Sequence, residues 1–173
     1  FCTSSQLSLG DMKMVRLSDL VESQANRLRD LECPEFDSQP WVEGPPLDRR
    51  RVAIISTAGL HRRNDSPFMM QSDPSQPGPT DYRVIPGDST ANDLIMSHVS
   101  PNFDRTGFQQ DWNVVFPLDR LRELCQAGII GSMADFHYSF MGGADPRLME
   151  PSARRLASLL KQDHVDGVVL VPV

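Results

Sequence analysis

The sequence has 173 residues, of which 39% are hydrophobic and 23% charged, an ordinary composition for a globular domain with one core. Its net charge of -6 and isoelectric point near 5.1 argue against a general nucleic-acid binder, because such a protein presents a basic face. No apolar run approaches the roughly 18 residues that span a bilayer, so no membrane segment is expected. The three cysteines (Cys2, Cys33 and Cys125) match neither a disulfide framework nor a zinc motif, which indicates a reducing, cytoplasmic setting without a metal site.

The N-terminal stretch differs from the rest of the chain. Phe1 to Asp11 is rich in Ser and Thr and has no apolar periodicity, and Met12 or Met14 is a more natural start. We therefore expect residues 1–13 to be a disordered or non-native extension. Residues 14–173 are then expected to form the folded part of the chain.

Three segments with helical periodicity follow. Ser18 is a suitable N-cap, and the partial apolar stripe behind it predicts a helix over residues 19–32. Pro117 opens a second helix, which Gly128 closes. We expect the last helix to begin at Pro151.

Short apolar, β-branched runs predict the strands. Residues 51–57 and 167–172 are typical of buried parallel strands, and residues 113–116 form a similar shorter run. Residues 82–86 predict a short strand, and residues 91–98 either a turn of helix or a strand.

Loops connect these elements. Residues 58–63 follow a strand at the position of a binding loop, and residues 64–81 form a long loop rich in proline. Strands that alternate with helices predict a Rossmann-like α/β fold with a mostly parallel sheet and flanking helices. The sheet is expected to be incomplete at the C-terminus, because no element follows the last strand.

Basic side chains lie where the first buried strand ends. The Ser56–Gly59 turn resembles a loop that cradles a ligand, although an ordinary turn between a strand and a helix is the alternative. His61, Arg62 and Arg63 follow it, and Arg pairs with carboxylates through two parallel hydrogen bonds. They are candidate substrate-binding residues, with a solvated basic loop as the alternative.

A second group of polar residues lies between positions 98 and 113. His98, Asp104, Asp111 and Asn113 are candidate substrate-binding residues, and their spacing matches no standard metal site. A polar network that fixes a loop is the alternative for Asp111 and Asn113.

The third group combines a histidine, a phenol and a hydroxyl close to two glycines. We expect His137, Tyr138 and Ser139 to form a turn before the last helix. His137 and Tyr138 are candidate catalytic residues, since histidine transfers protons near neutral pH, and Ser139 is a candidate substrate-binding residue. A buried aromatic turn is the alternative.

Taken together and in order, these motifs resemble the selenoprotein B family of glycine, sarcosine, betaine and D-proline reductases, with the D-proline type nearest. The motifs that carry the resemblance are Ser56–His61, Tyr82–Pro86, Ser97–His98, Asp111–Asn113, Phe116–Leu124, Gly128–Gly131, His137–Gly142 and Asp166–Val173.

The resemblance implies a reductive cleavage of the Cα–N bond of D-proline, glycine, sarcosine or betaine, with a dithiol as electron donor. In the family a selenocysteine or cysteine nucleophile directly follows the Pro-Val pair, so here it would follow Val173, and the chain as given is expected to be inactive. The chain itself would carry no cofactor, whereas a companion subunit would carry a pyruvoyl group. One of Arg62 and Arg63 would hold the substrate carboxylate, and His137 would protonate the leaving nitrogen.

Two other functions stay open. The chain could be a binding or regulatory subunit without catalysis, or another α/β amino-acid enzyme such as a racemase-like protein. An in-frame UGA codon after Val173 would favour the reductase, and a different stop codon would favour the alternatives.

Overall fold

The structure is a computed structural model, and it describes residues 16–30, 37, 41–69, 78–98, 103 and 105–173. The chain divides into two compact units, residues 1–37 and residues 38–173. The first unit contains a 3-10 turn at Leu17–Asp19 and helix α1 at Glu22–Arg29, so the predicted helix is confirmed but shorter. The extension expected at residues 1–13 lies outside the described residues.

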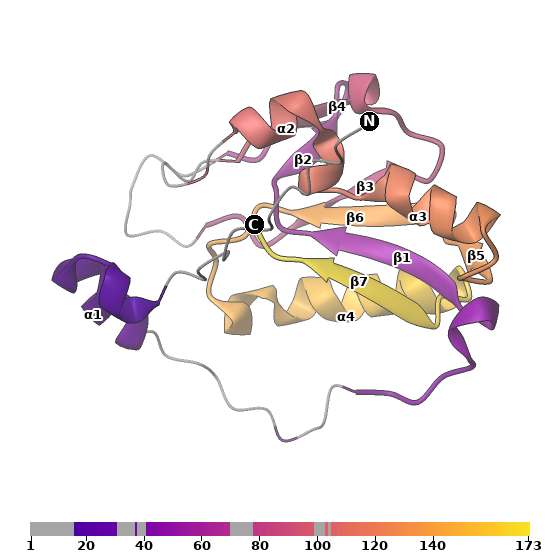
Figure 1. Ribbon diagram of the computed structural model, residues 1–173, viewed down its shortest axis with the longest axis horizontal. Coiled ribbons are helices and arrows are strands. Elements are labelled where there is room, and N and C mark those ends of the chain that lie inside the picture. Colours follow the sequence, from indigo (N-terminus) through magenta and orange to yellow (C-terminus); the bar gives the residue numbers. More distant parts are fainter. Residues whose placement is uncertain (1–15, 31–36, 38–40, 70–77, 99–102, 104) are drawn as a thin grey trace, which may run out of the picture. The chain divides into compact units, whose positions relative to one another are not determined.

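The second unit is built around a five-stranded sheet whose central strand is β1, Arg51–Ser56 (Figure 1). β1 pairs in parallel with β7 (Gly167–Val171) along one side. Along the other side it pairs in parallel with β5 (Ser132–Met133) and β6 (Phe136–Phe140). β3 (Tyr82–Pro86) pairs antiparallel with β6. The predicted α/β fold with a mostly parallel sheet is therefore confirmed.

β7 is less buried than predicted. Its residues pair with β1 from Gly167 to Val171, but Val168 and Val169 are exposed and Leu170 retains 70% of its accessible surface. The reason is its position: among the described residues, no strand pairs with the outer edge of β7.

A second, two-stranded sheet lies beside the first. β2 (Leu60–Arg62) pairs antiparallel with β4 (Leu94–Met96), and a 3-10 turn at Ala91–Asp93 leads into β4. The expectation that residues 58–63 form a loop was wrong, because three of these residues pair with β4. Residues 91–98 contain both of the predicted alternatives, a helical turn and a strand.

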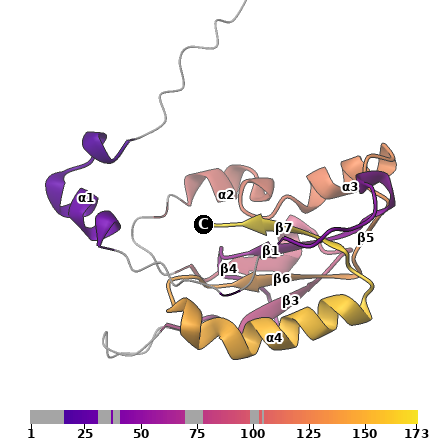
Figure 2. The same cartoon turned by 90° about the horizontal axis from the view of Figure 1, so that it is seen from below.

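Helices cover both faces of the main sheet (Figure 2). α2 (Thr106–Gln110) and α3 (Leu118–Gln126) lie on one side, and α4 (Pro146–Gln162) lies on the other. A 3-10 turn at Leu47–Arg49 precedes β1. The larger core, on the α3 side, includes Ile54, Leu60, Ile85, Phe116, Leu118 and Leu121, and the smaller one includes Tyr138, Phe140 and Leu156.

The second predicted helix is confirmed in α3, which Pro117 precedes. The strand expected at residues 113–116 is absent, because Trp112–Val114 forms a 3-10 turn in which the Asp111 carboxylate accepts from the Asn113 N–H at 2.9 Å. Val115 and Phe116 are fully buried all the same, so their apolar character reflects the core and not a strand.

The last helix begins earlier than predicted. Asp145 caps it by accepting from the Arg147 N–H at 2.9 Å, and Pro146 occupies the first helical position, where its missing N–H costs little. Pro151 lies inside the helix. It is only the sixth residue, so the one intrahelical hydrogen bond that it removes lies near the helix start.

The segment His137–Tyr138–Ser139 forms the middle of β6 and not the expected turn. Alternation along the strand directs His137 toward the core that contains Phe116, and Tyr138 toward α4. Backbone N–H groups of Ile54 and Leu60 donate to His137 Nδ1 and Ser139 Oγ, at 3.0 and 2.9 Å, which lowers the cost of burying these side chains.

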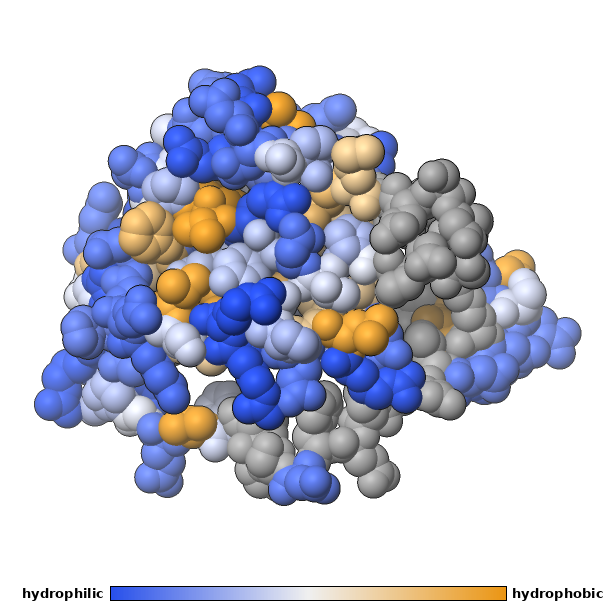
Figure 3. Space-filling view, turned by 180° about the vertical axis from the view of Figure 1, so that it is seen from behind, coloured by the Kyte–Doolittle hydropathy of each residue, from blue (hydrophilic) through white to orange (hydrophobic). Residues whose placement is uncertain are grey.

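One face of the molecule shows how hydrophobic side chains are distributed. Over the described residues of the face in Figure 3, hydrophilic side chains predominate and hydrophobic ones form small separate groups. Among the described helices, none combines the length and apolar character required to cross a bilayer.

The Asp163 carboxylate links the end of α4 to residues at the amino ends of β1 and β6 through hydrogen bonds. Asp163, directly after α4, accepts from Arg51 Nε at 3.1 Å and from the Asp135 N–H at 2.8 Å. Burial opposes ionisation, but the hydrogen bonds from Arg51 and the backbone outweigh it and lower the pKa of Asp163 below 3.8. The charged carboxylate is therefore the form that the fold stabilises.

Replacing this carboxylate should destabilise the protein. We expect Asp163→Asn to reduce the free energy of unfolding at pH 7 by about 2 kcal/mol, the typical contribution of a hydrogen bond to a charged group. Because the folded-state pKa is lowered, the contribution is complete above pH 3.8 and disappears as the pH falls through that lowered pKa. Urea unfolding at pH 7 and at about pH 3 measures both effects.

Glu150→Gln is the matched control. It removes one carboxylate from an exposed pair with Arg154, so it should cost less than about 0.5 kcal/mol. Equal losses in the two variants would contradict the role of Asp163.

Candidate functional site

The carboxyl ends of three parallel strands meet at one edge of the main sheet. Parallel sheets of this type hold their ligands beyond this edge. Figure 1 shows the C-terminus beside the tips of β1, β6 and β7. We call the residues that gather there the carboxyl-edge site: Thr57, His98, Ser139, Gly142 and Val173.

Thr57 fixes the end of β7. Its N–H donates to the Val171 carbonyl at 3.1 Å, and its Oγ1 accepts from the Val173 N–H at 2.8 Å. The hydroxyl also lies 3.4 Å from the Val173 carbonyl oxygen, to which it can donate. One side chain therefore holds both backbone groups of Val173 after the regular strand has ended.

Two glycines let the backbone approach this edge closely. Gly142 has a φ of +73°, and a Cβ at this position would lie 3.2 Å from the Thr57 Cβ. Gly59 has a φ of +67°, and a Cβ there would lie 3.1 Å from the His98 backbone nitrogen. Glycine adopts such left-handed conformations at little cost, so both positions suit it for conformation and for space.

His98 is buried at the same edge with one ring nitrogen unused. Its ring packs at a tilt of 54° against Phe103 with 4.9 Å between centroids, and its Nδ1 has no hydrogen-bond partner among the described residues. Burial lowers the pKa of His98; the nearby Thr57 and Ala58 backbone opposes this, and Arg105 adds to it. The imidazole is therefore neutral at pH 7, with one ring nitrogen that donates a hydrogen bond and one that can accept a proton.

The side chains of two further candidates, Ser139 and His61, are already hydrogen-bonded within the protein. Ser139 Oγ accepts from the Leu60 N–H at 2.9 Å and lies 3.3 Å from the Phe140 carbonyl. His61 is buried, with Nε2 2.7 Å from Ser97 Oγ and Nδ1 2.8 Å from the Arg62 carbonyl. These contacts suggest that His61 positions the segment that carries His98.

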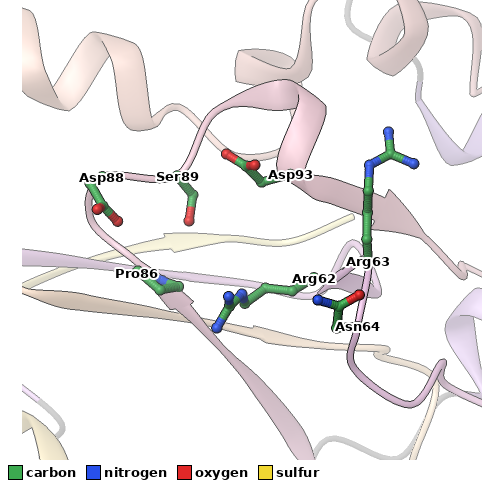
Figure 4. Close-up of a pocket in the computed structure, with 7 residues that line it drawn as sticks. All are labelled: Arg62, Arg63, Asn64, Pro86, Asp88, Ser89 and Asp93. Atoms are coloured by element: carbon green, nitrogen blue, oxygen red, sulfur yellow. The ribbon is translucent and has the colours of Figure 1, made fainter.

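Arg62 and Arg63 lie elsewhere. They line a separate cavity of about 380 Å³ together with Asp88 and Asp93 (Figure 4). Arg63 Nε donates to the Asn92 carbonyl at 2.5 Å, which fixes this side chain at the rim. The structure therefore separates the two arginines from the carboxyl-edge site.

Asp111 and Asn113 belong to a polar network that fixes a loop. Asn113 Nδ2 donates to Asp111 at 2.8 Å and to Asp119 at 2.9 Å, and Trp112 Nε1 donates to Asp119 at 2.7 Å. This arrangement matches the structural alternative considered for them. Asp104 lies outside the described residues.

The two predicted catalytic residues lie in the core. His137 is fully buried, its Nδ1 accepts from the Ile54 N–H, and its Nε2 has no partner among the described residues. Burial is the main cause that lowers its pKa to about 4. Tyr138 is buried against Tyr82, 5.7 Å between centroids, and burial raises its pKa.

His137 is also distant from the end of β7. Ile54, to which it bonds, pairs with Val169, and Val173 follows four residues later. Four extended residues span roughly 13 Å. A proton transfer from His137 to a group beyond Val173 would require a rearrangement, and its predicted role stays a prediction.

Sequence reasoning did not identify Thr57 as a site residue. The signal was present in the Ser56–Gly59 turn, but the partner of the hydroxyl lies 116 residues later. Among the described residues, no group of three or more His, Cys, Asp or Glu side chains could hold a metal ion.

Comparison with known proteins shows what the chain resembles. A family model described as glycine/sarcosine/betaine reductase selenoprotein B matches residues 28–173. D-proline reductase subunit gamma of Acetoanaerobium sticklandii is 35% identical over 121 residues, 69% of this chain and 47% of that protein. Glycine reductase complex component B subunit gamma of Symbiobacterium thermophilum is 30% identical over 141 residues, 79% of this chain and 32% of that protein.

Sarcosine reductase complex component B subunit beta of Peptoclostridium acidaminophilum is 27% identical over 139 residues, 79% of this chain and 31% of that protein. The chain thus spans about a third to a half of the length of these relatives. No solved structure matches it significantly.

The buried histidines should make stability depend on pH. The folded-state pKa of His137 is lowered from 6.5 to about 4, so its contribution is complete above pH 6.5 and is lost as the pH falls toward 4. Burial also lowers the folded-state pKa of His98, so its contribution to stability is likewise lost as the pH falls. Urea unfolding at pH 7 and at about pH 5 should show this loss, and His137→Gln should reduce the difference between the two pH values.

His164→Asn is the control for this titration. His164 is exposed and has a φ of 53°, a conformation that Asn tolerates, so this variant removes one exposed histidine without disturbing the fold. A pH dependence that His137→Gln leaves intact would contradict the prediction.

Removing the Thr57 hydroxyl should release the end of β7. We expect Thr57→Val to speed hydrogen exchange at the Val173 amide and to lower the free energy of unfolding by about 1 kcal/mol, the net value of one hydrogen bond. Amide exchange followed by NMR measures the first effect. Ser158→Ala, which removes an exposed helical hydroxyl, should alter neither quantity measurably. An unchanged exchange rate of the Val173 amide in Thr57→Val would show that the Thr57 hydroxyl does not hold Val173.

Proposed function

The chain belongs to the glycine/sarcosine/betaine reductase selenoprotein B family, and we propose that it is the N-terminal portion of a subunit that reductively cleaves a Cα–N bond. In this proposal the substrate is D-proline, glycine, sarcosine or betaine, and a dithiol supplies the electrons. The names of the relatives support this range of substrates. They are called subunits or components of complexes, which supports a companion subunit.

The observation that carries the proposal is the hydrogen bonding between Thr57 and Val173 at the carboxyl edge. Thr57 holds Val173 in a fixed position, and the buried His98 lies against the same Thr57–Gly59 segment. We propose that a selenocysteine or cysteine follows Val173 and is the nucleophile. A selenolate is ionised at neutral pH, whereas a thiol with a pKa near 8.5 is mostly protonated, and the ionised form is the one that attacks.

The proposed reaction balances with one dithiol. The selenolate forms a bond to Cα, and the electron pair of the Cα–N bond leaves with nitrogen, which gains a proton. A thiol then takes the selenium from carbon, carbon gains a proton, and the external dithiol reduces the selenium–sulfur bond. A pyruvoyl group on the companion subunit would activate the Cα–N bond.

In this proposal His98 relays the proton to nitrogen. It is buried near the end of β7 and is a neutral base at pH 7, so its Nδ1, unused among the described residues, accepts a proton from the dithiol, and the imidazolium then passes a proton to nitrogen. The catalytic roles predicted for His137 and Tyr138 remain predictions, and both would require the core around β6 to open.

A binding role without catalysis is the second candidate. The charged cavity between Arg62 and Asp88 favours it, because a ligand can occupy that cavity independently of the carboxyl edge. The codon after Val173 separates the two candidates: an in-frame UGA followed closely by a cysteine codon supports the reductase.

Activity measurements test the proposal directly. The purified 173-residue chain should show no dithiothreitol-dependent turnover of D-proline, glycine, sarcosine or betaine. The chain continued through the nucleophile and mixed with its companion subunit should be active, and His98→Asn in that protein should lower turnover by roughly 10²- to 10⁴-fold. Turnover by the 173-residue chain alone would rule the mechanism out.

His164→Asn serves as the control, since this exposed residue lies after α4 and away from the edge. A thermal unfolding midpoint close to that of the unmodified protein establishes that His98→Asn still folds. Full activity of the folded His98→Asn protein would remove His98 from the mechanism.

A further inference from the structure

The cavity lined by Arg62 and Asp88 has the charges of an amino-acid site. Two arginines and two aspartates surround about 380 Å³, the lower range of small-molecule sites. The formal charges cancel, so the cavity favours neither a simple anion nor a simple cation. We infer that it binds a small zwitterionic amino acid at a place separate from the carboxyl-edge site.

Arg62 provides a cation whose side chain makes no hydrogen bond to a described residue, although its charge acts on the Asp93 carboxylate. Its backbone is bonded: the N–H donates to Asp65 Oδ2 at 3.2 Å, and the carbonyl accepts from the Asp65 N–H at 3.0 Å. In Figure 4 its side chain reaches across the cavity toward Pro86, whereas Arg63 extends to the other side. A guanidinium group binds a carboxylate through two parallel hydrogen bonds.

Asp88 provides the unused anion. None of the described residues donates a hydrogen bond to its carboxylate, and Figure 4 shows it on the opposite side of the cavity from the base of Arg62. Asp93 differs, because it accepts from the Thr90 N–H and hydroxyl, both at 2.8 Å. Asp88 is therefore the carboxylate available to an ammonium group.

The loop that carries Asp88 is held in position before any ligand binds. The Gly87 N–H donates to the Asp135 carbonyl at 2.8 Å, and Arg122 Nη2 donates to the Gly87 and Ser89 carbonyls at 2.9 and 2.7 Å. A Cβ at Gly87 would lie 2.8 Å from the Ala134 carbonyl oxygen. A preformed loop spends little free energy on ordering when a ligand arrives.

The cavity is remote from the carboxyl edge. Pro86 pairs with Phe136 at the beginning of β6, whereas the Phe140 carbonyl at its end accepts from Gly59 at the carboxyl edge. Four residues of strand separate these points by roughly 13 Å. The inference shares its ligand class with the proposed function but needs neither the nucleophile nor the companion subunit.

Calorimetric titration of the 173-residue chain with glycine, acetate and methylamine tests the inference. Each charge-assisted contact contributes about tenfold in affinity, so glycine should bind at least about tenfold more tightly than either single-charge fragment. Arg62→Gln and Asp88→Asn should each weaken glycine binding by about tenfold. Betaine, whose nitrogen cannot donate to Asp88, should bind more weakly than glycine.

Arg120→Gln and Glu150→Gln are the matched controls, since each removes one charge from an exposed pair outside the cavity. Arg62→Lys keeps the charge but loses the planar fork, and it should bind with intermediate affinity. Acetate binding as tight as glycine binding, no glycine binding, or glycine binding that survives both cavity variants would overturn the inference. If glycine binds as expected but the chain continued through the nucleophile and mixed with its companion subunit shows no reductase activity, the proposed function alone is overturned.

Discussion

The arrangement of this domain depends on the parallel pairing of β1 with strands on both of its sides. Five residue pairs join β1 to β7, and two join it to β6 near the end where all three strands stop. This register brings Ser56, Ser139 and Val171 to the same level. The residues that follow them along the chain, Thr57, Phe140 and Val173, therefore lie close together at the carboxyl edge. The Thr57 hydroxyl is near enough to bond to the backbone of Val173, which follows β7.

The fold could be predicted where local patterns and burial agree. Residues 51–57 are mostly apolar or β-branched, and Arg51–Ser56 form the central strand because both faces of the sheet are covered there. The proline and glycine that flank α3 mark its ends correctly. β6 was misjudged because His137 and Ser139 are polar, and only tertiary contacts of His137 Nδ1 with Ile54 and of Ser139 Oγ with Leu60 offset part of the cost of burying them inside a sheet. The start of α4 was predicted too late, at Pro151, because a proline is also tolerated inside the first turns of a helix that begins earlier.

The site could be predicted only where strand ends determine it. His98 and Ser139 lie at the carboxyl edge because the segments that carry them bond to Gly59 and Leu60. Arg62 does not, because β2 continues away from that edge and pairs with β4. Strands as short as β2 and β4, three residues each, have no recognisable hydrophobic pattern in the sequence, so their antiparallel pairing could not be predicted. A side chain only two positions beyond Leu60 therefore belongs to a different cavity.

The exposed side of β7 has a consequence for the behaviour of the isolated chain. Gly167–Val171 is apolar, uncharged and free of proline, and its outer backbone groups have no strand partner among the described residues. Such an edge is a template for adding another strand, since every unpaired amide and carbonyl can bond to a neighbouring molecule. Concentrated samples of the chain by itself should therefore self-associate, and the attraction should be strongest near the isoelectric point, where mutual charge repulsion is smallest.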